Sequence, residues 1–203
     1  MTTKGRLKAF FDNEKEEFKL IKKYEENIIF FNDLIKNGHK EDIEFVIPIK
    51  MYNYAFPLER KGYYAKAFVV ADEIEEDLKK LKGQSKWYET YLEGVMFLKG
   101  LCLGRMKKYK ESNQYFKQLV NKKTTNDNFI NWYKSNKQNQ INKISNYIVV
   151  IVMSIVVMCI ILNFTNIFRI PVIVEVLLFT IGGIIWIASY IWIEIIDKQK
   201  IKK

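Results

Sequence analysis

The chain has 203 residues, 49% of them apolar, and a formal net charge of +10. This length accommodates one domain of ordinary size together with a membrane segment. The two cysteines, Cys102 and Cys159, fall in a helix-like soluble segment and in an apolar run, so we expect neither a disulfide nor an oxidising compartment. The first residues are basic but have no apolar stretch behind them, and we therefore expect no cleavable signal peptide.

Residues 1–133 are predicted to form an all-α domain. Their apolar side chains recur every three to four residues, the spacing of helices that bury one face, and no stretch sustains the two-residue alternation of a strand. Pro48 is expected to break or begin a helix and Pro57 to mark another boundary, because proline lacks the backbone N–H that an α-helix needs. The predicted helices cover residues 6–36, 41–54, 64–81, 87–102, 109–119 and 129–133.

Two segments of this domain share a pattern of small and aromatic residues. One of them reads GLCLGRMKKYKESNQYFKQLV and has a small residue, Gly100, in its first helix. The second helix of this segment carries Tyr109, Ser112, Phe116 and Leu119. The earlier segment carries the corresponding residues Tyr64, Ala67, Ala71 and Ile74.

Over residues 48–124 this pattern resembles the packing positions of the tetratricopeptide (TPR) family. The sequence departs from that family in spacing, since Tyr64 and Tyr109 lie 45 residues apart where a regular repeat has about 34. The resemblance implies an irregular TPR-like helical-repeat domain that binds a partner protein along a concave face. The candidate contact residues on the first helix of each pair are Tyr54, Tyr91, Met96 and Lys99.

No pattern of a catalytic, metal or cofactor site is visible, and we expect a protein that is not an enzyme and that binds no cofactor. His39, the only histidine, follows Asn37 and Gly38 in a predicted turn, where we expect a solvated side chain and not a catalytic base. The sequence has no histidine–cysteine cluster for zinc and no glycine-rich phosphate loop. The acidic run at residues 72–77 is expected to be a solvated helix face and not a metal site.

Basic residues are concentrated in one part of the chain. Residues 1–98 contain 17 basic and 18 acidic residues, whereas residues 99–146 contain 11 basic and 2 acidic residues. Each basic residue near an anionic leaflet contributes roughly 1 kcal/mol of attraction, so we expect contact with the cytoplasmic leaflet or with an acidic partner. The interleaved aromatic residues fall at core positions, and nucleic acid is not expected as a partner. The predicted membrane-proximal basic set comprises Arg105, Lys107, Lys108, Lys110, Lys134, Lys137 and Lys143.

Two apolar runs predict a C-terminal transmembrane helical hairpin. Residues 147–168 carry no charge and would span about 33 Å as a helix, enough for a hydrocarbon core of about 30 Å. A turn at residues 169–171 leads to the second predicted helix, residues 172–196. A basic polar linker at residues 134–146 precedes the hairpin, and a basic tail at residues 197–203 follows it.

The charges that flank the hairpin predict its orientation. Three lysines directly precede the first apolar run and four follow the second, against Arg169 alone in the turn, so an integral membrane protein with both termini in the cytoplasm is expected. The lysine-, asparagine- and isoleucine-rich composition points to a bacterial inner membrane. Glu175 in the second run either marks an ion path or, as we expect, snorkels to the interface or pairs with Arg169.

Two functional hypotheses follow from this organisation. The first is a membrane-anchored cytosolic adaptor, whose TPR-like domain binds a partner protein. The second is an oligomerising effector, in which the hairpin forms a pore or disrupts the membrane while the helical domain acts as a sensor or assembly platform. Gly182 and Gly183 would help helices to pack closely in such a homo-oligomer.

Overall fold

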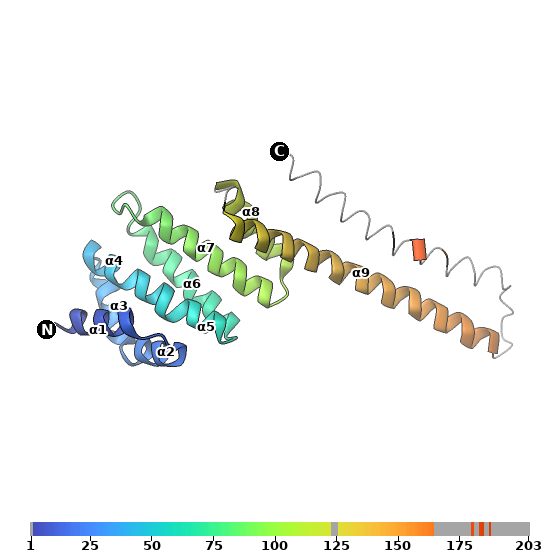
Figure 1. Ribbon diagram of the computed structural model, residues 1–203, viewed down its shortest axis with the longest axis horizontal. Helices are drawn as coiled ribbons and strands as arrows, with labels where there is room; N and C mark the ends of the chain where they lie inside the picture. The colour runs from blue at the N-terminus through green and yellow to red at the C-terminus, as the bar shows by residue number, and fades with distance from the viewer. Residues whose placement is uncertain (1, 123–125, 165–179, 181–182, 185–186, 188–203) are drawn as a thin grey trace. The chain divides into compact units, whose positions relative to one another are not determined.

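The structure, a computed structural model, describes residues 2–122, 126–164, 180, 183–184 and 187. This described part is helical and has no strand, which confirms the predicted all-α class (Figure 1). The chain divides into two compact units, a helical domain (Met1–Tyr133) and a C-terminal unit (Lys134–Lys203). The helices are α1 (Thr3–Asn13), α2 (Glu17–Glu26), α3 (Ile28–Asn37), α4 (Lys40–Pro48), the π-helix η1 (Ile49–Ala55), α5 (Phe56–Arg60), α6 (Tyr64–Lys79), α7 (Tyr88–Arg105), α8 (Tyr109–Lys122) and α9 (Asp127–Phe164).

The predicted single helix over residues 6–36 is wrong, because α1, α2 and α3 occupy this stretch. Glu14 is extended (φ −81°, ψ 133°), and its carboxylate accepts hydrogen bonds from the backbone N–H groups of Lys15 and Glu16 at 2.9 and 2.8 Å. A side chain that takes up backbone donors in this way competes with the helix. The second interruption is at Asn27 (φ −116°, ψ 15°), whose side-chain amide donates back to the preceding turn at 2.8 Å.

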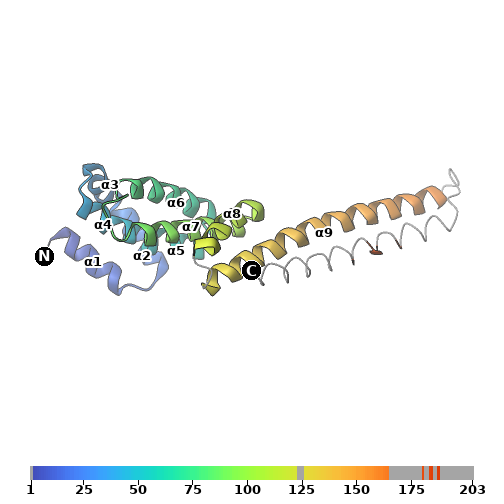
Figure 2. The same cartoon turned by 90° about the horizontal axis from the view of Figure 1, so that it is seen from above.

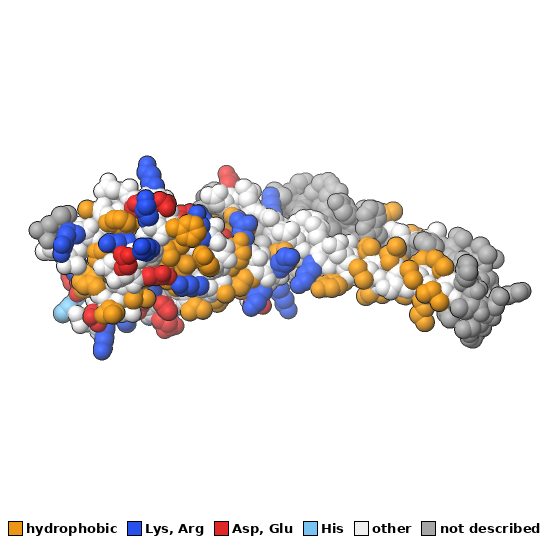
Figure 3. Space-filling model, turned by 90° about the horizontal axis from the view of Figure 1, so that it is seen from below, with side chains coloured by type: hydrophobic (Ala, Val, Ile, Leu, Met, Phe, Trp, Pro, Cys, Tyr) orange, Lys and Arg blue, Asp and Glu red, His pale blue; other side chains and the backbone are white. Residues whose placement is uncertain are grey.

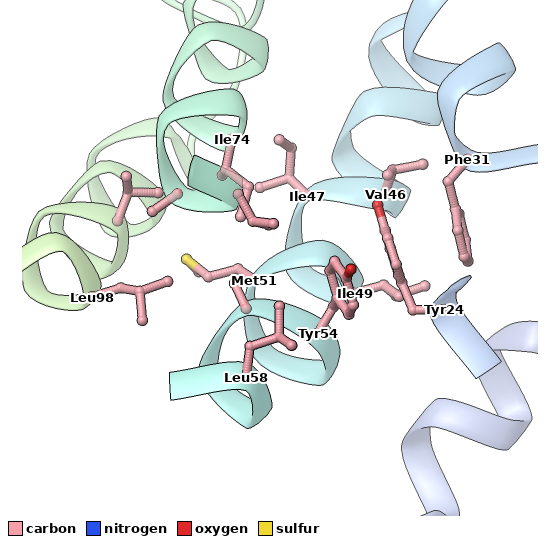
Figure 4. Packing of buried hydrophobic residues seen from close by; sticks show 14 of the residues in the cluster. Tyr24, Phe31, Val46, Ile47, Ile49, Met51, Tyr54, Leu58, Ile74 and Leu98 are labelled. Atoms are coloured by element: carbon pink, nitrogen blue, oxygen red, sulfur yellow. The ribbon is translucent and has the colours of Figure 1, made fainter. Parts of the chain in front are cut away.

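These two interruptions let α1, α2 and α3 fold onto one aromatic cluster. Tyr24 of α2 is stacked between Phe31 of α3 and Tyr54 of η1, with ring centroids 4.8 and 4.3 Å apart (Figure 4). Phe11 of α1 reaches the same cluster, 6.2 Å from Phe31. All four side chains are buried, so the N-terminal helices are held by aromatic packing in the core of the domain.

The segments α4, η1 and α5 follow one another without a break in the helical backbone. Pro48 (φ −62°, ψ −38°), Ala55 (φ −68°, ψ −44°) and Phe56 (φ −65°, ψ −43°) are all right-handed helical. The two prolines therefore lie at the predicted boundaries, Pro48 between α4 and η1 and Pro57 at the start of α5, but the helix type changes there without a break in the helical backbone. In an α-helix the ring of Pro57 would press on the carbonyl four residues earlier, which lies in η1, and the wider π-turn gives that ring room.

The π-helix lies at the centre of the domain. Met51, Tyr54 and Leu58 point from η1 and α5 into the core, as Figure 4 shows. The sulfur of Met51 lies 3.0 Å from the place where a Cβ at Gly94 would stand, so α7 approaches η1 closely. On another side, the Asn53 amide donates to a backbone carbonyl of α1 at 3.3 Å. The segment therefore holds together helices that are far apart in sequence.

The predicted apolar stripe of the next helix is confirmed by its burial. The side chains that form it are fully buried: Ala67, Ala71, Ile74, Leu78 and Leu81. α6 packs against α7, and α7 packs against α8 (Figures 1 and 2).

α7 and α8 approach each other closely at a glycine. The Ser112 hydroxyl of α8 donates to the Gly100 carbonyl of α7 at 2.6 Å, and a Cβ at Gly100 would stand 2.9 Å from the ring of Phe116. A small residue at position 100 is therefore a packing requirement. α7 continues three residues past its predicted end at residue 102, to Arg105, and Lys107 then takes up the left-handed conformation (φ 60°).

A buried lysine of η1 pairs with two carboxylates of α6. The Lys50 side chain is 7% exposed, and its ammonium lies 2.9 Å from the Glu73 carboxylate and 3.3 Å from that of Asp77. Glu73 and Asp77 are four residues apart and so lie on the same face of the helix. An unpaired ammonium at this depth would be costly, and the two carboxylates remove that cost.

A second buried lysine reaches α6 from α7. Lys99 is 4% exposed and forms ion pairs with Asp72 and Glu75, which are three residues apart. Burial acts against the charged form, but hydrogen bonds to the two carboxylates outweigh it and raise the pKa of Lys99. The acidic run of α6 was predicted to be a solvated helix face. It is more than that, because four of its carboxylates pair with buried lysines.

α9 joins three segments that were predicted to be separate. Its 38 residues, about 57 Å long at 1.5 Å per residue, contain the short helix at 129–133, the linker at 134–146 and most of the apolar run that begins at residue 147. The predicted linker is therefore helical. Within the helical domain, Trp132 stacks on Phe116 of α8, with ring centroids 6.1 Å apart.

The second half of α9 is apolar and poorly covered. Figure 3 shows apolar side chains gathered along α9 where it approaches the end of its described part. By length and composition, α9 is the one helix in the described part of the chain that could cross a membrane. The first predicted helix of the hairpin thus falls in a helix that is long and apolar enough to span a membrane, whereas the second lies outside the described residues.

Replacing Lys50 with methionine is expected to lower the free energy of unfolding by about 1–3 kcal/mol, because Asp77, which is 14% exposed, would lose one of its two cations and keep only Lys80. Lys79→Met is the matched control, since Lys79 pairs with Glu76 on the exposed side of α6, where ion pairs contribute about 0–1 kcal/mol. Pulse proteolysis of the full chain in detergent over a urea series measures both variants. Equal unfolding midpoints for the two would contradict a structural role of the Lys50 ion pairs.

Candidate functional site

A surface pocket of about 270 Å³ lies between α2, the end of α5 and the start of α6. Phe18 and Tyr63 form its walls, and they are 54% and 51% exposed. Ile21 and Leu58 lie beneath them and are buried. Two half-exposed aromatic rings over an apolar base make this pocket a candidate site for an apolar group of a ligand.

The turn after α5 determines the position of Tyr63. Gly62 has φ +88°, which glycine adopts without strain, and its N–H donates to the Glu59 carbonyl at 3.0 Å. The N–H of Tyr63 donates to the Leu58 carbonyl at 2.9 Å. These two bonds form a Schellman motif, which brings the residue after the glycine against the third residue before the end of the helix. Tyr63 and Leu58 consequently line the same pocket.

Charged side chains surround the pocket in pairs. Glu17 pairs with Arg60 and with Lys61, the latter at 3.2 Å, and the Lys61 ammonium lies 4.7 Å from the centre of the Phe18 ring. Burial acts to raise the pKa of Glu17, but the hydrogen bonds from the two cations together outweigh it and hold this pKa below its usual range. Lys61 reaches the pocket through its contact with Phe18, and it is partly exposed, so a ligand with its own charge can exchange partners with it.

A second charged pair lines the other side of the pocket. The Lys66 ammonium lies 2.7 Å from the Glu25 carboxylate, which also accepts a hydrogen bond from the Tyr54 hydroxyl at 3.1 Å. The hydrogen bond from Lys66 is the main reason why the pKa of Glu25 lies below its usual range, and the one from Tyr54 adds to it. This network connects the pocket to the aromatic cluster, because Tyr54 is stacked on Tyr24.

The four predicted partner-binding residues do not form one surface. Tyr54, Met96 and Lys99 are buried and have little area to offer a partner. Tyr91 is half-buried, and burial raises the pKa of its hydroxyl. Partner binding by these residues stays a prediction, and of the four only Tyr54 contacts residues that line the pocket.

The predicted basic set is for the most part exposed. Arg105 lies between the Glu59 carboxylate, 3.3 Å away, and the Trp132 ring, 5.2 Å from its centre, and so supports the start of α9. Lys137 is partly buried. Glu175, the turn at residues 169–171 and the tail at residues 197–203 lie outside the described residues. The remaining members of the set are exposed: Lys107, Lys108, Lys110, Lys134 and Lys143.

Residues suited to metal or nucleophile chemistry are not gathered in the described part of the chain. No group of three or more histidine, cysteine or acidic side chains there has the geometry of a metal site. His39 is exposed and precedes the first residue of α4. Cys102 is buried, and this burial raises the pKa of its thiol to about 12, so that the thiol stays protonated at neutral pH.

The pocket was not predicted from the sequence. Phe18 fits the apolar spacing of a helix and therefore resembles a core residue, although its ring is half exposed. The signal that could have pointed to Tyr63 is the glycine before it, because a helix that ends at a Schellman glycine places the next residue against the helix.

Comparisons of the chain with protein-family models, with curated proteins and with solved structures found no match.

Glu25 is expected to titrate below the usual glutamate range in the full chain, and Lys66→Met is expected to return its pKa towards that range. A carboxylate with a lowered folded-state pKa contributes to stability above its unfolded pKa, and this contribution is lost as the pH falls through the lower folded value. Carbon-13 NMR of the Glu25 carboxyl group measures the midpoint in both proteins. Identical midpoints in both would show that Lys66 does not hold the carboxylate.

Proposed function

We propose that the chain is a membrane-anchored adaptor, in which α9 spans the bilayer and the helical domain binds another protein. The observation that carries the anchor is the exposure of most apolar side chains in the second half of α9, although Val156 is buried. Consecutive helix residues are about 100° apart, so Val149, Val150 and Ile151, all exposed, already face three directions. A helix that is apolar all round needs either a protein core or a membrane around it.

The polar groups of this part of α9 support the same proposal. No charged residue occurs between Tyr147 and Phe164. The hydroxyl of Ser154 donates to the Val150 carbonyl of its own helix at 2.8 Å, which removes an unsatisfied donor from a hydrocarbon environment. Since residues 147–161 provide no polar stripe to line water, they favour an anchor over a pore.

We further propose the finer topology expected from the sequence, in which residues 172–196 return across the bilayer and both termini lie in the cytoplasm. Lys134, Lys137 and Lys143 precede the apolar part of α9 within three or four helical turns. On the cytoplasmic side, they would lie near anionic headgroups, where each contributes roughly 1 kcal/mol of attraction. The pair formed by α6 with the η1–α5 segment, and the pair formed by α7 and α8, would act in this adaptor as an irregular TPR-like scaffold.

The native Cys159 tests the membrane position of α9. In inside-out vesicles that contain the Cys102→Ala chain, Cys159 is expected to resist a membrane-impermeant maleimide, because the reactive thiolate does not form in hydrocarbon. Asn139→Cys, at an exposed position in the polar part of the same helix, is the control and should be labelled quickly. In right-side-out vesicles this control should not be labelled. Equal labelling of both positions from water would refute the anchor.

Crosslinking of the native membranes followed by mass spectrometry tests the adaptor role. An adaptor is expected to give crosslinks from the helical domain to a second protein at a fixed stoichiometry. Crosslinks that join only copies of this chain, together with leakage of dye from liposomes that contain it, would favour the oligomerising effector instead.

A further inference from the structure

The size of the pocket between α2, α5 and α6 limits what it can bind. Small-molecule and cofactor sites usually occupy about 300–1,000 Å³, and this pocket, at about 270 Å³, lies below that range. A cavity of this size suits one large side chain. Such a side chain would be an anchor residue of a partner protein, which contributes much of the binding energy by filling a pocket.

The walls of the pocket fit such an anchor. Phe18 and Tyr63 each leave about half of their surface to solvent at the mouth, while Leu58 closes the base with 1% exposure. An apolar anchor between the two rings would remove their exposed faces from water, and aromatic contacts of this kind rank among the strongest in interfaces. Phe18 and Tyr63 can be changed without opening the core, because the core lies beneath them.

The charges around the pocket specify the chemistry beside the anchor. Three cations, Arg60, Lys61 and Lys66, face two carboxylates, Glu17 and Glu25, which leaves one positive charge in excess. Lys66 is 52% exposed and Lys61 32% exposed, and the ion pairs that they form are weak at such positions. A carboxylate on the partner can therefore bind to Lys61 or Lys66 at little cost, whereas a cation would meet repulsion.

We propose that this pocket binds one large apolar side chain, aliphatic or aromatic, of a partner protein segment that carries an aspartate or glutamate within one helical turn of it. This inference rests on the proposed adaptor function and names the partner chemistry of its site. Tyr63 and Phe18 hold the anchor, and Lys61 and Lys66 bind the neighbouring carboxylate.

The test uses the full chain in lipid nanodiscs and a phage library of random 12-residue peptides. Enriched peptides are expected to share one large apolar residue with an aspartate or glutamate within four positions of it. The best peptide is then synthesised with a fluorescent label, together with one counterpart in which the apolar residue is alanine and one in which the acid is its amide. Fluorescence polarisation gives the dissociation constant of each.

Substitutions locate the binding site. Phe18→Ala and Tyr63→Ala are each expected to raise the dissociation constant about tenfold or more, the effect typical of an anchor contact. Ile29→Ala is the control, because this side chain is 76% exposed and does not line the pocket, and it should leave the dissociation constant unchanged. Lys66→Met combined with Lys61→Met should weaken the acidic peptide several-fold and leave the amide counterpart unaffected.

The outcomes separate this inference from the adaptor role itself. If peptides bind but Phe18→Ala and Tyr63→Ala have no effect, the pocket assignment is overturned while an adaptor with another site remains. If no peptide is enriched over empty nanodiscs, the assignment is overturned too, and crosslinking still decides the adaptor role. Enriched peptides without an acid would overturn the charge preference.

Discussion

The helical domain depends on the ion pairs between α6 and two buried lysines. Lys50 comes from the π-helix and Lys99 from α7, and each ammonium is more than nine-tenths covered. At that depth a cation is tolerated only with carboxylates beside it, so α6 must present Glu73 and Asp77 to one neighbour and Asp72 and Glu75 to the other. This requirement fixes the rotation of α6 about its axis, and the apolar stripe from Ala67 to Leu81 packs inwards in agreement with it.

The pocket follows from the same framework. The continuous helix from Lys40 to Arg60 includes the π-helix η1 and runs through the core. The Schellman motif at Gly62 follows it and directs Tyr63 onto Leu58. Tyr54, on the same helix, joins the aromatic cluster with its ring and the Glu25–Lys66 pair with its hydroxyl. A site formed by exposed side chains is in this way supported by residues that are themselves fixed by packing.

The all-α class could be predicted from the sequence, because apolar residues such as Ala67, Ala71, Ile74 and Leu78 recur at the spacing of one buried helix face. The breaks near Glu14 and Asn27 could not, since each depends on a side chain that competes for backbone hydrogen bonds. Apolar spacing also does not distinguish a covered ring from a half-exposed one such as that of Phe18. The long apolar run predicted a helix that is long and apolar enough to cross a membrane, and α9 is such a helix, while the hairpin and both functional hypotheses stay predictions.

The turn after α7 has the same hydrogen-bond pattern as the one after α5, but Lys107 takes the place that Gly62 occupies there. A side chain in the left-handed region costs about 1 kcal/mol relative to glycine. The corner between α7 and α8 is therefore strained, although Gly100 and Phe116 fit closely along the two helices. We expect local unfolding of the domain to begin at this corner. α8 would then detach from α7 as a unit before the ion pairs of Lys50 and Lys99 with α6 break.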